Sequence, residues 1–133
     1  MKPQVHFCYT RVMIEVNGRI RHKRLVEDYV LNLCRSLSLD RRKSWSIEVS
    51  FVGSLEGGCM GLCTDDPDNE ILVEIARSDP SGSCINFYVA MQTLAHEMVH
   101  AKQFIKGEYP SEREAKALEF ELFAKCFPWR ELP

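Results

Sequence analysis

The sequence has no apolar run of the roughly 18 residues that a membrane-spanning helix requires. Residues 1–6 also lack the apolar core of a secretory signal peptide. We therefore expect a cytoplasmic protein with no membrane partner. No linker rich in Pro or Gly and no internal repeat divides the 133 residues, so we expect a single domain that spans residues 1–133.

The chain also has little net charge. Its formal charge is -2 at pH 7, which is too small to indicate a nucleic-acid or an acidic partner. Basic clusters at residues 19–24 and 41–43 permit a nucleic-acid contact without requiring one. The chain has six cysteines, and its sequence shows no export signal. We therefore expect the cysteines to be reduced thiols. The single close pair, Cys59 and Cys63, is only a weak metal signal.

Along the chain, the spacing of apolar residues changes between the period of two that is typical of strands and the period of about 3.6 that is typical of helices. Strands are expected at residues 5–16, 46–52, 59–64 and 71–76. Helices are expected at residues 19–37, 84–106 and 112–127. The last two strands are expected to pair as a hairpin. This order predicts an α+β fold in which a small mixed or antiparallel sheet packs on the last two helices.

The long helix expected at 84–106 contains an HExxH motif, His96-Glu97-Met98-Val99-His100. Side chains four residues apart on a helix differ by about 40° in direction and about 6 Å in height, so both imidazoles can reach one metal ion. Neither histidine falls on the apolar stripe of this helix, which favours a ligand role over a packing role. Glu97 is expected to take a proton from metal-bound water.

A catalytic zinc ion needs a third protein ligand and an open position for water. The pattern HExxHxxGxxH is not completed, because residues 103 and 106 are glutamine and lysine. The remaining donors are Glu112 and Glu114 at the start of the next helix, and we expect Glu114 to be the ligand. Ser111 and Glu114 also fit a capping box, in which Glu114 bonds to the backbone of Ser111. In that case Glu112 becomes the ligand.

The HExxH motif followed by Glu112-Arg113-Glu114-Ala115 resembles the gluzincin metallopeptidases, in particular the minimal kind found in bacterial and phage proteins. The resemblance covers residues 84–127. It implies bound Zn²⁺, peptide-bond hydrolysis, and a zincin-like active-site helix followed by a glutamate-bearing helix. It also implies that Glu114 is the third metal ligand, because the ligand glutamate of this family is often followed by an alanine. Position 118 is leucine where some gluzincins have an acidic residue that orients a zinc histidine, and Glu121 is the expected substitute.

The resulting hypothesis is a zinc hydrolase that acts on a peptide or protein substrate. Zinc lowers the pKa of its bound water towards about 7, and Glu97 passes the proton on to the leaving amine. Tyr109, in the turn between the ligand-bearing helices, is the expected donor to the oxyanion. The substrate is expected to pair as an added strand with residues 59–64 or 71–76.

Three other readings fit the same residues. The first is a SprT-like protease that acts on proteins bound to nucleic acid, although the chain lacks a downstream zinc-ribbon cysteine pattern. The second is a non-catalytic binding domain stabilised by zinc, which requires His6, His22 or a cysteine to close the fourth coordination position. The third is a scaffold that keeps the fold without the metal.

Overall fold

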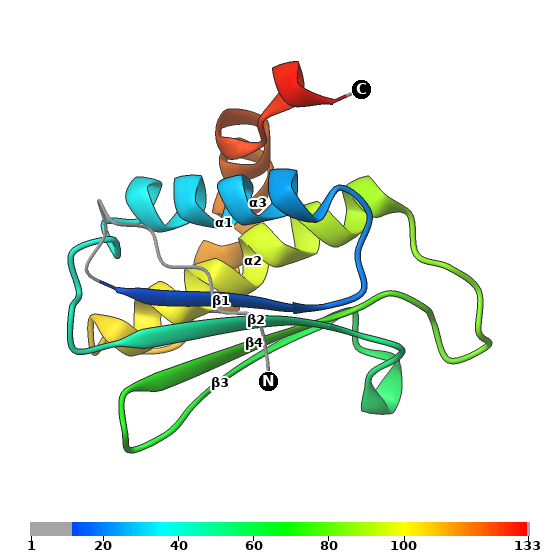
Figure 1. The fold of residues 1–133 in the computed structure, drawn as a ribbon. Helices are drawn as coiled ribbons and strands as arrows, with labels where there is room; N and C mark the ends of the chain where they lie inside the picture. The colour runs from blue at the N-terminus through cyan, green and yellow to red at the C-terminus, as the bar shows by residue number, and fades with distance from the viewer. Residues whose placement is uncertain (1–11, 133) are drawn as a thin grey trace.

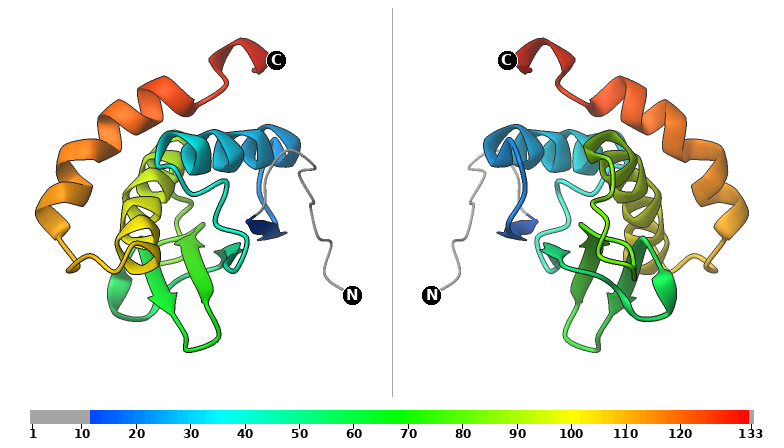
Figure 2. Two further views of the ribbon diagram at one scale, coloured as in Figure 1. Left: turned by 90° about the vertical axis from the view of Figure 1, so that its left-hand side faces the viewer. Right: turned by 90° about the vertical axis from the view of Figure 1, so that its right-hand side faces the viewer.

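A mixed four-stranded sheet lies against α1 and α2, and α3 packs on these two helices (Figure 1 and Figure 2). The computed structural model describes residues 12–132. In chain order the elements are β1 (Met13–Gly18), α1 (Lys23–Ser36), β2 (Ser46–Val52), β3 (Gly61–Asp65), β4 (Glu70–Ala76), α2 (Phe87–Ile105) and α3 (Glu112–Cys126). Short 3-10 turns lie at Glu56–Gly58 and Trp129–Glu131. The expected α+β class is confirmed.

The strand order in the sheet is β1-β2-β4-β3. β1, β2 and β4 run parallel, and β3 pairs antiparallel with β4, as expected for a hairpin. The carboxylate of Asp66 tightens the hairpin turn by accepting hydrogen bonds from the N–H groups of Asp68 and Glu70. Because β4 lies between β2 and β3, only β3 of this hairpin keeps an edge that is unpaired among the described strands.

The core lies between the sheet and the helices. In β2, Ile47, Val49 and Phe51 are buried while the residues between them are half-buried on the opposite face, which is the alternation that the sequence predicted. α2 buries Met91 and packs on β3, β4 and α3. The hydroxyl of Tyr29 in α1 donates a 2.8 Å hydrogen bond to the backbone oxygen of Met91, so α1 and α2 are joined inside the core.

Helix α1 begins four residues later than the helix predicted from residue 19. Residues 19–24 are rich in cationic side chains, which are unfavourable at the positive end of a helix dipole. His22 precedes the helix in a left-handed conformation (φ 53) and no side chain caps the first turn. Most of the expected first strand, residues 5–11, lies outside the described residues. None of the helices within residues 12–132 combines the length and the apolar composition needed to cross a bilayer.

Exchange of Tyr29 for phenylalanine tests the bond between α1 and α2. Tyr29→Phe should lower the free energy of unfolding by about 1 kcal/mol, because a fully buried hydrogen bond is lost without a change of shape. Urea denaturation measures the difference. Tyr88→Phe is the matched control, because Tyr88 is 42% exposed. Equal destabilisation by both exchanges would contradict the role given to the Tyr29 hydroxyl.

Candidate metal centre

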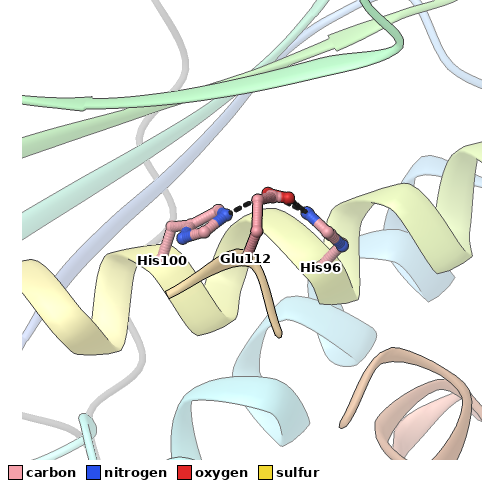
Figure 3. Close-up of side chains that lie close together, drawn as sticks. All are labelled: His96, His100 and Glu112. Carbon is pink, nitrogen blue, oxygen red and sulfur yellow. Dashed lines mark hydrogen bonds and ion pairs between the residues drawn. The ribbon is translucent and has the colours of Figure 1, made fainter. Parts of the chain in front are cut away.

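The two histidines of the HExxH motif lie on α2 and face the start of α3 (Figure 3). Their ring centroids are 5.2 Å apart. Their side chains keep only 14% and 15% of their surface exposed. α2 is capped by Asn86, whose side chain accepts a hydrogen bond from the Tyr88 N–H, and it runs unbroken from Phe87 to Ile105. The helix therefore holds His96 and His100 one turn apart, as predicted.

Glu112, the first residue of α3, places its carboxylate between the two imidazoles (Figure 3). Its Oε1 lies 2.8 Å from Nε2 of His96 and 2.8 Å from Nε2 of His100. One ligand atom from each of the three residues lies within 4.8 Å of the others. Donors on a tetrahedral Zn²⁺, with bonds of about 2.0–2.1 Å, lie about 3.3 Å apart. These residues, which we call the metal triad, could therefore hold a metal ion.

Hydrogen bonding around the metal triad shifts the pKa values of Glu112 and His100. The hydrogen bond from His100 is the main reason that the pKa of Glu112 lies below its usual range. Burial lowers the pKa of His100, but the hydrogen bonds with Gln103 and Glu112 outweigh burial and leave that pKa raised. A divalent ion would replace the protons at the two Nε2 atoms, so metal binding is coupled to proton release.

Gln103 fixes the orientation of His100 and the start of α3. Its side chain is 1% exposed, and its Oε1 accepts hydrogen bonds from Nδ1 of His100 (2.8 Å) and from the backbone N–H of Ser111 (3.1 Å). Because Oε1 can only accept, Nδ1 of His100 carries a proton. Nε2 of the same ring is then the nitrogen that faces the metal triad, which is the way outer partners commonly orient metal-binding histidines.

The carboxylate that the structure places with the two histidines is that of Glu112, whereas Glu114 was expected there. The carboxylate of Glu114 instead accepts hydrogen bonds from Nε2 of Gln103 (2.8 Å) and Nζ of Lys102 (3.0 Å), and these bonds lower its pKa. Only half of the expected capping box forms. The Ser111 hydroxyl accepts from the Glu114 N–H, but the Ser111 N–H donates to Gln103 rather than to Glu114.

Glu119, and not the expected Glu121, is the acidic residue of α3 that lies beside Nδ1 of His96. Its Oε1 lies 3.7 Å from Nδ1 of His96, and its Oε2 accepts a 3.1 Å hydrogen bond from Gln92. Glu119 follows Glu112 by seven residues, or two helical turns, so both point to the same side of α3. This spacing is the sequence signal that identifies Glu119, whereas Glu121 lies on the exposed side of the helix.

Glu97 is buried beside the metal triad, against β3. It is 7% exposed, and burial raises its pKa, although His96 and His100 partly oppose that shift. A Cβ atom at Gly61 of β3 would lie 2.8 Å from Cγ and 3.0 Å from Oε2 of Glu97. The glycine therefore makes room for the carboxylate. Glu97 forms no hydrogen bond with any residue between 12 and 132, so its oxygens remain available to a ligand or to water.

Tyr109 does not join the triad. It lies in the turn before α3 with 92% of its surface exposed, and within the described residues its hydroxyl makes no hydrogen bond. The turn positions its side chain towards solvent. The structure thus gives no support to Tyr109 as a donor to an oxyanion.

No fourth protein ligand accompanies the metal triad in the part of the chain that the structure describes. His22 instead packs edge-on against Phe87, with 5.7 Å between ring centroids. His6 lies outside the described residues. A site with three protein ligands and one open position is typical of catalytic zinc, whereas structural zinc usually has four protein ligands.

The described cysteines form no disulfide and no metal cluster. Cys34 and Cys126 are buried and Cys63 is half-buried, whereas Cys59 and Cys84 are exposed. Comparison of the chain with protein-family models, with curated proteins and with solved structures finds no match.

Exchange of either glutamate for alanine tests which one is the metal ligand. Glu112→Ala removes a member of the triad and should weaken Zn²⁺ binding by more than about 100-fold, beyond the usual effect of losing an outer partner. Glu114→Ala leaves the triad intact and should weaken binding by less than about tenfold. Calorimetric titration against a competing chelator measures both. A larger loss with Glu114→Ala would restore Glu114 as the ligand.

Proposed function

We propose that the chain is a zinc-dependent hydrolase, specifically a small metallopeptidase that cleaves peptide bonds. The observation that carries the proposal is the metal triad with a buried carboxylate, Glu97, beside it and no fourth protein ligand within residues 12–132. Two imidazoles and one carboxylate suit Zn²⁺ and leave a position for water. The resemblance of the HExxH segment to gluzincins agrees with this donor set.

In the proposed reaction, the bound metal and the residues around it have separate roles. Zn²⁺, when bound, supplies a Lewis acid and lowers the pKa of a water molecule towards about 7. With the ion in place, the carboxylate of Glu97 would take a proton from water and later donate it to the leaving amine. Burial raises the pKa of Glu97 and so brings it closer to neutrality, where one group can both accept and donate a proton. The hydrogen bond from Nδ1 of His100 to Gln103 would keep that imidazole aimed at the ion, and the carboxylate of Glu119 lies 3.7 Å from Nδ1 of His96.

The edge strand β3 is the proposed site for an extended peptide. β3 pairs with β4 on one side, and no other described strand pairs with its second side. A peptide added there would form backbone hydrogen bonds that do not depend on its sequence. β3 also packs on α2, and Gly61 lies against Glu97. A substrate strand along β3 would therefore lie close to the base and to the metal triad.

Two alternatives have less support from the geometry. A non-catalytic domain stabilised by zinc would need a fourth ligand, and the described residues offer none. A SprT-like protease acting on nucleic-acid-bound proteins would need a cationic surface beside the substrate strand. Arg19 and Arg21 instead line a pocket at the start of α2.

Glu97→Gln separates metal binding from hydrolysis. The variant should retain one Zn²⁺ per chain, because Glu97 is not a ligand, and should lose activity by about 100-fold or more, because its amide cannot accept the proton. Zinc content is measured by elemental analysis, and cleavage by mass spectrometry of a mixed peptide library. Undiminished cleavage would remove Glu97 as the base. Absence of cleavage by the zinc-loaded wild type across the library would contradict the peptidase proposal.

Gly61→Ala tests the contact between β3 and the base. The added methyl group would come within 2.8 Å of Glu97 Cγ and should displace the carboxylate, lowering cleavage while zinc stays bound. Gly53→Ala is the matched control, because nothing lies within 4 Å of its added methyl group. The same peptide assay compares the two variants. Equal activity of both would show that Gly61 does not set the position of Glu97.

A further inference from the structure

A pocket of about 480 Å³ lies beyond the carboxyl ends of β1 and β4, at the start of α2. In Figure 1 the connections that leave these two parallel strands reach the same end of the sheet as the first turn of α2. Ligands of open sheets with parallel strands commonly bind beyond the carboxyl ends of the strands. The pocket residues used below, which we call the arginine pocket, are Arg19, Arg21, Arg77, Ile20, Ile85 and Phe87.

Three arginines line the arginine pocket, and no acidic residue does. Arg19 and Arg21 follow β1, and Arg77 directly follows β4. None of the three forms an ion pair or a side-chain hydrogen bond with another residue in the described range 12–132. Three unneutralised positive charges around one pocket favour an anionic ligand.

Arg77 shows the clearest lack of a partner. Its Nε is buried and has no hydrogen-bond partner among the described residues. Its backbone is held in place, since its N–H donates to the Val52 oxygen (2.8 Å) and its own oxygen accepts from the Ile85 N–H (2.8 Å). A buried donor without an acceptor costs free energy, and the guanidinium group of Arg77 is not neutralised by any described residue.

The rest of the arginine pocket is apolar. Ile20, Ile85 and Phe87 contribute hydrocarbon surface. The guanidinium carbon of Arg21 lies 5.9 Å from the centroid of the Phe87 ring, so this cation is held over the aromatic face. A matching ligand therefore has a charged group and an apolar body.

Charge and size together favour a phosphate monoester over a simple carboxylate. Pockets for small molecules usually measure about 300–1,000 Å³, and this one lies in that range at about 480 Å³. A phosphate dianion can pair with more than one guanidinium group, and the planar arginine fork matches phosphate oxygens in pairs. A monoanionic carboxylate would leave more of the positive charge unpaired.

The arginine pocket is separate from the metal triad. Phe87 and His96 are nine residues apart on α2, which at about 100° per residue places their side chains on opposite sides of the helix, about 13 Å apart along its axis. We propose that the arginine pocket binds a small phosphate monoester with an apolar substituent, as a second site distinct from the metal triad. This proposal does not depend on hydrolase activity.

Calorimetry on the full chain with phenyl phosphate as the probe tests the proposal. Chelator-treated protein is used, so that a metal ion cannot bind the phosphate. Phenyl phosphate should bind at one site per chain. It should bind at least about tenfold more tightly than inorganic phosphate, because the apolar residues bury the ring. It should also bind at least about tenfold more tightly than phenylacetate, because the dianion pairs with more guanidinium groups.

Variants then identify the pocket. Arg77→Met and the double variant Arg19→Gln with Arg21→Gln should each weaken phenyl phosphate binding by about tenfold or more. Arg19 and Arg21 are exposed, so the double variant should fold and can test the pocket even if Arg77→Met misfolds. Arg41→Gln with Arg42→Gln removes the same charge from a distant exposed loop and should change binding less than twofold. Phe87→Leu should weaken phenyl phosphate binding more than inorganic phosphate binding.

Three results would overturn the proposal. The first is no binding of phenyl phosphate by the folded wild-type chain. The second is an equal effect of the Arg41/Arg42 control, which would show a nonspecific response to net charge. The third is tighter binding of phenylacetate than of phenyl phosphate, which would assign the pocket to carboxylates instead.

Discussion

The buried amide of Gln103 is the interaction on which the candidate metal centre depends. A glutamine side chain offers two donor hydrogens and two acceptor lone pairs, and here all four are used, on His100, on both backbone groups of Ser111 and on Glu114. The amide thereby sets the protonated nitrogen of His100 and the point at which α3 begins. Since Glu112 is the first residue of α3, its carboxylate is positioned by the same amide.

Helix α2 connects the other features of the molecule. One side buries Met91 and Leu94 in the core, while another carries the two histidines towards α3. Between these sides, Glu97 lies under β3, where Gly61 leaves it space. The first turn of the same helix contributes Phe87 to the arginine pocket. A single rigid element thus holds two candidate sites at a constant separation, because both are built on its backbone.

The sequence predicted the features that depend only on the spacing of residues within one strand or one helix. Alternation gave β2 its observed bounds, and the HExxH spacing predicted the pairing of the two histidines because helix geometry alone produces it. The choice between Glu112 and Glu114 was not predictable in this way. Glu114 is held by Lys102 and Gln103 of the preceding helix, which reach it only after the chain has turned back. The basic cluster at residues 19–24 is visible in the sequence, but only the tertiary fold brings Arg77 beside Arg19 and Arg21.

The members of the metal triad and the amide that holds them all come from one helical hairpin, residues 96–114. Closing so short a loop costs little chain entropy, so this unit can assemble before the sheet is complete. An ion bound there acts as a cross-link between α2 and α3, and its binding energy adds to the local stability of the hairpin. Loss of such an ion would loosen α3 first, while the parallel strands, which contribute none of the three triad residues, would keep their protection against hydrogen exchange.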